Sequence, residues 1–238
     1  NNRTLWNLAE KLKISIFGTS AKYIDSCQRL RLKPNDFSTL PKLKTILSTG
    51  SPLSNENFKY VYENIKSDVL LGSISGGTDI ISCFALANPM LPVEEGELQS
   101  IGLGMDVHAF DENGKKVIDK KGELICSSVF PSMPIYFWND PNNKKYKDAY
   151  FSKYKNIWHH GDFIRISKKG NMKIFGRSDA TLNPGGVRIG TSEIYRIVEK
   201  INEISDSLVV GQSWKGDQRI LLFLKMEQNK PFNETIVK

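Results

Sequence analysis

The stretch VLLGSISGGTDI, residues 69–80, decides how the fold is assigned. Its first three residues are apolar and bulky, which is typical of a short buried strand. The residues that follow are too polar and too flexible for a core, since two serines and three glycines precede Thr78 and Asp79. A strand that ends in bare backbone, a hydroxyl and a carboxylate predicts a ligand site at its carboxyl end.

The segments before this strand alternate between strands and helices. The predicted helices cover residues 5–12, 21–30 and 54–65, and the predicted strands cover 14–17, 45–48 and 69–71. In the third helix the apolar residues recur at spacings of three and four, and Ser54 is the expected N-cap, with Asn55 as the alternative. This βαβαβ order favours a parallel sheet with helices packed on it.

Three loops rich in Gly, Ser and Thr leave the carboxyl ends of these strands: GTS (18–20), STGSP (48–52) and SISGGTD (73–79). One such loop is weak evidence, because small polar residues are common in turns. In open parallel sheets, however, ligands bind beyond the carboxyl ends of the strands. Three loops at one edge therefore predict a nucleotide or acyl-phosphate site.

The pattern changes after about residue 89, where short strands separated by tight turns favour antiparallel pairing, with hairpins predicted around the turns at 111–114 and 167–171. Near the end, a helical face over 194–201 precedes two strands around a turn at 215–217. We therefore expect an α/β fold with three parts: a parallel-sheet part over 1–96, an antiparallel, β-barrel-like part over 97–178, and an incomplete small α+β domain over 179–238.

The composition limits the class of protein. The 238 residues carry a net charge of +7 and three cysteines, at positions 27, 83 and 126. Since the cysteines are far apart and odd in number, we expect neither a disulfide framework nor a zinc site, and a reducing compartment fits best. No apolar stretch has the length of a membrane span, and the N-terminus lacks a signal-peptide pattern. The first residue is not Met, which suggests that an upstream part is missing.

The densest basic cluster, NNKKYKDAYFSKYK at 142–155, mixes lysines with aromatic residues. It is either a solvated loop or a surface that contacts RNA or phosphates. We favour the solvated loop, because runs of charge are usually exposed faces. No zinc finger, homeodomain or RNP motif supports nucleic-acid binding.

Two short stretches carry groups suited to a nucleoside. In STGSP, Gly50 exposes backbone NH and CO groups that suit the edge of a flat heterocycle, although an ordinary strand-to-helix turn is the alternative. In WHHGD (158–162), Asp162 can accept hydrogen bonds from vicinal hydroxyls such as those of ribose. His159 and His160 should point to opposite faces of a strand, so they make a poor metal pair.

The stretch GRSDATLNPGGVRIGTSEI, residues 176–194, is the most informative one. Arg177 and Arg188 are candidates for phosphate or ribose contacts, because a guanidinium group bonds such oxygens in a fork. A surface loop between domains with ordinary arginines is the alternative. We favour the ligand-binding interpretation because glycines, arginines and carboxylates are gathered just ahead of a helix.

Together these stretches resemble the adenylate-forming superfamily of acyl-CoA synthetases, luciferases and peptide-synthetase adenylation domains. STGSP is similar to its adenine-contacting loop, and SISGGTD to its aromatic/Gly–x–Thr–Glu motif. GELIC, HHGDF and the 176–194 stretch are similar to three further motifs, in the family's order. Within the superfamily, LSTGSPL, LLGSISGGTDIISCF, FWND, GRSDATLNPGGVR and SEIY resemble acetoacetate–CoA ligases. The resemblance spans essentially the whole chain.

The resemblance implies a nucleotide site made of Gly50, Ser51, Pro52, Gly77, Thr78, Asp162, Arg177 and Arg188. Thr78 would bond the α-phosphate and Arg188 would reach the phosphate during adenylation, so these two are the expected catalytic residues. Asp162 and Arg177 would hold the ribose hydroxyls. Asp79 stands where the family usually has a Glu near Mg²⁺, and this shorter carboxylate would contact the ion through water.

Four further roles follow from the same resemblance. Asp179 would be the hinge about which the small domain rotates, and Gly186 would line the pantetheine channel of CoA. Ser75 and Gly76 would line the acyl pocket. Acetyl-CoA synthetases carry a Trp at the position of Gly76, so its absence is expected to open volume for acetoacetate, and Gly76→Trp in an intact enzyme is expected to favour acetate.

The activity implied is the ligation of acetoacetate to CoA through an acyl-adenylate, with ATP/AMP, Mg²⁺ and CoA as cofactors. It implies small-molecule partners, no nucleic acid or membrane, and a cytosolic enzyme of ketone-body and lipid metabolism; the oligomeric state stays open. The family's upstream phosphate loop and C-terminal lysine have no match here, so these residues alone are expected to give no adenylation. Three alternatives remain: another short-chain acyl-CoA synthetase, a truncated nucleotide-binding remnant, or a basic RNA-binding protein.

Overall fold

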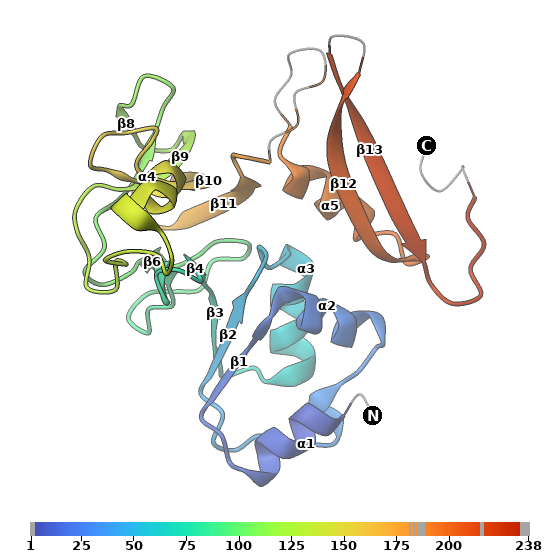
Figure 1. Ribbon diagram of the computed structural model, residues 1–238. Helices are drawn as coiled ribbons and strands as arrows, with labels where there is room; N and C mark the ends of the chain where they lie inside the picture. Colours follow the sequence, from blue (N-terminus) through green and yellow to red (C-terminus); the bar gives the residue numbers. More distant parts are fainter. Residues whose placement is uncertain (1–2, 181, 183, 185–188, 215–216, 234–238) are drawn as a thin grey trace. The chain divides into compact units, whose positions relative to one another are not determined.

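The computed structural model describes residues 3–180, 182, 184, 189–214 and 217–233 (Figure 1). The chain divides into two compact units, Asn1–Ile174 and Phe175–Lys238. A parallel sheet comes first in the sequence and antiparallel sheets follow it, which confirms the predicted mixed α/β fold class. The predicted domain limits at 96/97 and 178/179 stay predictions.

The parallel sheet has the strand order β1-β2-β3 (Figure 1). Its strands are β1 (Ile16–Ser20), β2 (Thr45–Thr49) and β3 (Leu70–Ser73). The helices of this part are α1 (Thr4–Lys11), α2 (Ala21–Arg29) and α3 (Asn55–Tyr60), with a 3₁₀ turn at Pro34–Asp36 and a π-helical turn at Val61–Ile65. Strand and helix side chains such as Phe17, Ile46 and Trp6 share one apolar core.

The predicted cap of the third helix is confirmed. The Ser54 hydroxyl accepts a hydrogen bond from the backbone NH of Asn57 at 3.2 Å, which satisfies one of the free donors at the start of α3. The apolar face of the same helix is buried, since Phe58, Val61 and Ile65 are each 3% exposed or less. This buried face fixes the helix against the sheet, and so fixes where the loop before it lies.

The antiparallel part contains two sheets, of which one has the order β4-β5-β6 and the other the order β11-β10-β9-β7-β8. Their strands are β4 (Ser75–Gly77), β5 (Ser82–Leu86), β6 (Ser100–Ile101), β7 (Val107–Phe110), β8 (Lys116–Val117), β9 (Lys121–Cys126), β10 (Trp158–Ile166) and β11 (Met172–Arg177). The larger sheet is open, because β8 and β11 are its two edges and no pairing joins them among the described residues. The predicted antiparallel pairing is confirmed, but its barrel-like closure is not seen.

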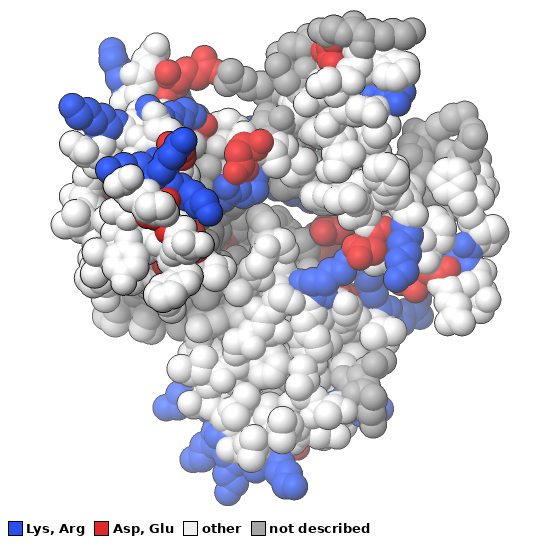
Figure 2. Space-filling view, in the orientation of Figure 1, with Lys and Arg blue, Asp and Glu red and all other residues white. Residues whose placement is uncertain are grey.

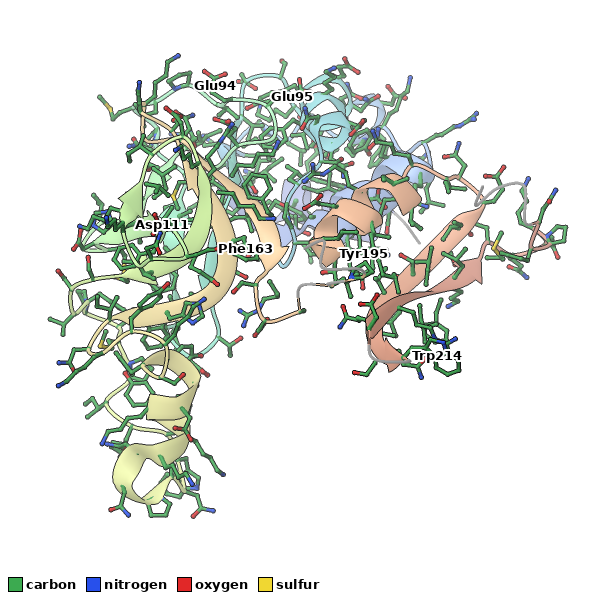
Figure 3. The ribbon with its side chains drawn as sticks, turned by 90° about the horizontal axis from the view of Figure 1, so that it is seen from above. Glu94, Glu95, Asp111, Phe163, Tyr195 and Trp214 are labelled. Carbon is green, nitrogen blue, oxygen red and sulfur yellow. The ribbon has the colours of Figure 1, made fainter. Side chains whose placement is uncertain are left out.

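Both predicted hairpins of this part are present. Asp111 lies in the turn between β7 and β8 (Figure 3), where its carboxylate accepts hydrogen bonds from the NH groups of Asn113 and Lys115. The second hairpin joins β10 to β11, and the Ser167 NH donates to the Asn171 carbonyl at 2.9 Å across its turn. Turn residues with short polar side chains therefore set the strand order here.

The basic cluster at 142–155 is only partly a solvated loop. A 3₁₀ turn (Pro141–Asn143) and helix α4 (Lys144–Tyr150) occupy it, and Tyr146 is buried in the core of the antiparallel part. The lysines of the helix are exposed, as expected of a charge run. On the face seen in Figure 2, Lys and Arg lie in separate groups with Asp and Glu among them.

The second unit is built on α5 (Thr191–Val198) and a hairpin of β12 (Ile204–Trp214) and β13 (Asp217–Met226). Tyr195 of α5 joins the helix to the hairpin (Figure 3), because its hydroxyl accepts a hydrogen bond from the Val209 NH at 3.0 Å. The predicted apolar face of α5 is only partly buried: Val198 is 5% exposed, whereas Ile197 is 69% exposed. Residues 215–216 of the predicted turn lie outside the described residues.

Two properties of the described residues bear on the class of protein. All three cysteines are free thiols, and burial raises the pKa of each. Among the described helices, none is both long and apolar enough to cross a bilayer.

Candidate functional site

The three predicted loops leave the parallel sheet at one edge. In the register of the sheet Ser20 pairs with Thr49, and Ser48 pairs with Ser73. The last residues of all three strands are therefore level with one another, as predicted. The Ser48 carbonyl also accepts a hydrogen bond from the Ile74 NH at 2.9 Å, which guides the chain out of β3.

The first of these loops serves the fold. Gly18 and Thr19 are part of β1, and the Ser20 hydroxyl accepts a hydrogen bond from the Tyr23 NH at 3.1 Å as the cap of α2. The second loop is open, since Gly50, Ser51 and Pro52 are exposed. Gly50 has a φ of +88°, a conformation that side chains disfavour, and nothing lies within 4 Å of the position of an added Cβ atom. Backbone groups suited to a heterocycle edge are therefore accessible in this loop.

The third loop is a tight hairpin. Gly76 and Gly77 in β4 pair with Cys83 and Ser82 in β5, and Thr78 and Asp79 form the exposed turn between the strands. The Thr78 carbonyl accepts a hydrogen bond from the Ile81 NH at 3.2 Å, and the Thr78 hydroxyl has no partner among the described residues. The hydroxyl and the carboxylate singled out by the sequence thus project at the tip of a supported turn.

The predicted reason for Gly76 is wrong. A Cβ atom there would lie 1.9 Å from the Ser82 carbonyl oxygen and 2.7 Å from the Cys83 Cα, both of them backbone atoms. Gly76 is required because β5 approaches it closely, and the backbone of β5 leaves no room for a Cβ atom there. The expected gain of acetate preference in Gly76→Trp therefore loses its basis, while the place of Ser75 and Gly76 in an acyl pocket stays a prediction.

Strand β10 brings two further groups to this hairpin. Its ladder with β9 is bulged, because three residues, 160–162, oppose Leu124 alone. In the bulge His160 lies 3.2 Å from the Gly76 carbonyl oxygen and 3.6 Å from Asp162 Oδ2, both measured from Nε2. Asp162 is only 8% exposed. Asp162, the predicted ribose ligand, is thus two residues from His160, whose imidazole supports β4.

The ring nitrogens of His160 have distinct roles. Trp158 Nε1 lies 3.4 Å from His160 Nδ1, and an indole NH can only donate. Nδ1 must then accept, so Nε2 carries the hydrogen and donates it to the Gly76 carbonyl. His159 points elsewhere, with Nε2 2.9 Å from a carboxylate oxygen of Glu123. The two histidines therefore have different partners, as their alternation in a strand predicts, and the described residues contain no group of three or more metal ligands.

Tyr150 at the end of α4 was missed as a site residue by the sequence analysis. Its hydroxyl donates to Asp79 Oδ2 at 2.5 Å, although the two residues are 71 positions apart. No other hydrogen bond or ion pair of the Asp79 carboxylate occurs within the part of the chain that is described. No local signal links the two residues; the only sequence signal was the run of aromatic residues within the basic cluster.

A cavity of about 630 Å³ lies beside α4. Its wall includes Cys126, Met133, Tyr146 and Trp158. None of the residues predicted for the nucleotide site lines it, so it does not explain their arrangement.

The second unit contains two of the predicted residues, Arg177 and Asp179. The Arg177 guanidinium holds the Asp179 carboxylate in a fork, with Nε–Oδ1 2.9 Å and Nη2–Oδ2 2.5 Å. These hydrogen bonds from Arg177, together with its charge, lower the pKa of Asp179 from its usual value of 3.8. Arg188 and Gly186, the other predicted residues of this region, lie outside the described residues.

This ion pair gives a pH prediction. Because the pKa of Asp179 is lower in the folded chain, the pair stabilises the fold above pH 3.8 and is lost as the pH falls through the lowered pKa. We expect an NMR titration of the Asp179 carboxyl carbon to have its midpoint below 3.8, and to shift upward in Arg177→Gln. A midpoint at or above 3.8 in the unaltered chain would contradict the pairing.

No protein-family model matches the chain. Sequence comparison finds acetoacetyl-CoA synthetases. The chain is 49% identical over 238 residues to that of Rhizobium meliloti, covering 100% of this chain and 37% of that protein. It is 52% identical over 236 residues to that of Gallus gallus, covering 98% of this chain and 35% of that protein. The chain thus spans about a third of the length of these relatives.

Two solved structures share the fold. An acetoacetyl-CoA synthetase from Streptomyces lividans matches 99% of this chain and 36% of its own, with a TM-score of 0.89 and 38% identity. An anthranilate CoA ligase in complex with anthranoyl-AMP matches 99% of this chain and 44% of its own, with a TM-score of 0.76 and 18% identity. At that identity the second match concerns the fold alone.

Proposed function

Because the chain belongs to the adenylate-forming superfamily and is homologous along its whole length to acetoacetyl-CoA synthetases, we propose that it carries nucleotide-binding and acyl-binding elements of an acetoacetate–CoA ligase. The observation that carries the proposal is the identity of about 50% over essentially the entire chain. It is supported by the position of His160, which lies 3.2 Å from the Gly76 carbonyl oxygen of the Thr78 hairpin and 3.6 Å from the Asp162 carboxylate. The relatives do not favour the other functions considered above.

The first half-reaction joins acetoacetate to AMP. A carboxylate oxygen of acetoacetate attacks the α-phosphorus of ATP, the bond to the bridging oxygen breaks, and pyrophosphate leaves with the electron pair. The Thr78 hydroxyl would donate to an α-phosphate oxygen, and Arg188 would offset the charge that develops there. Gly50, Ser51 and Pro52 would contact adenine through their backbone. Asp162 and Arg177 would hold the ribose hydroxyls, with the Asp162 carboxylate accepting hydrogen bonds from them.

Asp79 fits the role proposed for it toward Mg²⁺. The ion usually binds one or two carboxylates together with substrate phosphates and waters, so a single exposed carboxylate at the tip of the Thr78 turn suffices. When bound there, Mg²⁺ would neutralise charge on the transferring phosphate. Asp79 would hold it through water, since its side chain is shorter than the Glu of the family.

The second half-reaction forms the thioester. The CoA sulfur attacks the carbonyl carbon of acetoacetyl-AMP, the bond from that carbon to the phosphate oxygen breaks, and AMP leaves while the thiol proton passes to solvent. Asp179 is proposed as the hinge for the rotation between half-reactions, and Gly186 as a wall of the pantetheine channel. In the Arg177 fork, Asp179 already has a partner that a rotation would have to move.

The test is a chimaera. The chain replaces the aligned segment of the Rhizobium meliloti enzyme, and acetoacetate-dependent ATP–pyrophosphate exchange and thioester formation are measured against acetate and butyrate. We expect acetoacetate to be the preferred acid. In the chimaera, Asp162→Asn should weaken AMP binding about tenfold, since hydrogen bonds to a carboxylate are worth more than neutral ones, while Asp148→Asn on exposed α4 should leave it unchanged. A folded chimaera that prefers another acid would refute the proposal.

We also propose that the ligase acts in the cytosol, in ketone-body and lipid metabolism. Three free, buried or half-buried thiols support a reducing compartment. Fractionation of cells that express a tagged full-length gene would check the location.

A further inference from the structure

We propose that Tyr150 is a positioning residue that fixes the carboxylate of Asp79 for a divalent cation bound with the nucleotide. This inference rests on the proposed function. Its basis is a closed set of contacts that starts at Asp79, passes through three aromatic side chains, and returns to Gly76 in the same hairpin. All of these residues belong to the first unit.

The first contact orients Asp79. The Tyr150 hydroxyl donates to Oδ2 at 2.5 Å, the short end of the range for hydroxyl-to-carboxylate hydrogen bonds. Asp79 is exposed at a turn, where its side chain would otherwise rotate freely in solvent. The hydrogen bond selects one orientation and leaves Oδ1 for a cation or for a water molecule on that cation. The carboxylate is therefore already ordered when the chain folds. Cation binding then does not carry the entropic cost of ordering it.

The second contact orients Tyr150. Its ring stacks on Trp158 with centroids 3.7 Å apart and planes inclined by 15°. Trp158 is only 1% exposed and is held by aromatic neighbours, among them Phe130 at 5.5 Å between centroids. The tyrosine hydroxyl therefore projects from a rigid support at the end of α4. A rigid support is what a side chain needs if it is to hold another group in place.

The remaining contacts return to the hairpin. Trp158 donates to His160 Nδ1 at 3.4 Å, and His160 Nε2 donates to the Gly76 carbonyl at 3.2 Å. The hairpin is thus held at Gly76 by His160 and at Asp79 by Tyr150. Asp162, the proposed ribose ligand, lies 3.6 Å from His160. The set therefore fixes the proposed metal carboxylate relative to the proposed ribose carboxylate.

The test separates positioning from packing by removing one oxygen atom. Tyr150→Phe keeps the ring and its stacking on Trp158 but removes the hydrogen bond to Asp79. Tyr154→Phe is the matched control, since Tyr154 lies nearby and packs against Phe110 and His159 without a contact to Asp79. Both variants are made in the chimaera, and Mn²⁺ binding is followed by electron paramagnetic resonance at saturating ATP, with AMP binding measured without metal.

We expect Tyr150→Phe to raise the Mn²⁺ concentration at half saturation about fivefold, in line with the loss of one hydrogen bond to a charged group at an exposed site. AMP affinity without metal should not change, and Tyr154→Phe should change neither quantity. Equal Mn²⁺ affinity in Tyr150→Phe and the parent would overturn the proposal. So would an equal loss of AMP affinity, because it would indicate a general disturbance of the fold.

A second measurement keeps this inference distinct from the proposed function. Urea unfolding midpoints are compared for the 238-residue chain, Tyr150→Phe, Asp79→Ala and the double variant. If the hydrogen bond exists, the double variant should be shifted by less than the sum of the single shifts. Additive shifts would overturn the Tyr150–Asp79 contact whatever the nucleotide result. A chimaera that binds no ATP while the shifts are non-additive would instead remove the proposed function, and with it the cation role, and leave the contact standing.

Discussion

Gly76→Ala should destabilise the 238-residue chain by about 3 kcal/mol, the upper end of the usual cost of overpacking. The added Cβ atom would lie 1.9 Å from the Ser82 carbonyl oxygen and 2.7 Å from the Cys83 Cα. Both neighbours are backbone, so neither can move aside by changing a rotamer. The β4–β5 pairing must open instead, and the turn with Thr78 and Asp79 loses its support. The free energy of unfolding from urea denaturation measures the effect.

Gly18→Ala is the matched control for this substitution. Gly18 also lies in a strand, its φ is not in the left-handed region, and nothing lies within 4 Å of its added Cβ. The same chemical change should therefore alter the free energy of unfolding by no more than about 0.5 kcal/mol. If both variants lost equal stability, close approach of β5 would not be the reason for Gly76. If neither lost stability, the tight hairpin itself would be wrong.

This result also bears on the acyl pocket. Tryptophan at position 76 would meet the same backbone atoms as alanine and add a large ring, so Gly76→Trp is expected to disturb the hairpin before it reshapes any pocket. A change of acid preference in that variant would then report damage to the turn. Measurements of acid preference on Gly76 variants are informative only when the free energy of unfolding of the same variants is also measured.

Local patterns predicted the parts of the fold that local forces control. The Ser54 cap, the turn at 111–114 and the carboxyl ends of the parallel strands each depend on a few neighbouring residues, and each is present as predicted. The shared sheet edge followed from the βαβαβ order alone. Where a structural feature depends only on residues that are close in the sequence, the sequence is sufficient to predict it.

The errors concern contacts between distant segments. Glycine is required at position 76 because the backbone of β5 lies close to it. From the sequence alone, a glycine that leaves space for a ligand cannot be distinguished from a glycine at a position too crowded for a side chain. The hydrogen bond from Tyr150 to Asp79 spans 71 positions, and the bulge that brings Asp162 toward Gly76 depends on pairing with β9. Such contacts arise from packing of the antiparallel part, which periodicity does not describe.

Trp158→Ala should have a comparable or larger effect, with a loss of about 3–5 kcal/mol in the free energy of unfolding. Trp158 is 1% exposed and forms the centre of an aromatic cluster, with Tyr150 stacked on it at 3.7 Å and Phe151 edge-on at 5.8 Å. Alanine would leave these rings without a partner and would enlarge the adjoining cavity of about 630 Å³. Because the structure relaxes only partly around a cavity, both the lost contacts and the added cavity volume lower the free energy of unfolding.

Trp138→Ala is the control, because Trp138 is 90% exposed in the same chain and should cost no more than about 0.5 kcal/mol. Trp158→Phe gives an intermediate test: it keeps much of the apolar ring and removes the indole NH that donates to His160 Nδ1. A loss of about 1 kcal/mol is expected for that hydrogen bond, with more from the smaller ring. Equal effects of Trp158→Ala and Trp138→Ala on urea unfolding would show that the aromatic cluster does not support the hairpin, and the account of how Thr78 and Asp79 are held would fail with it.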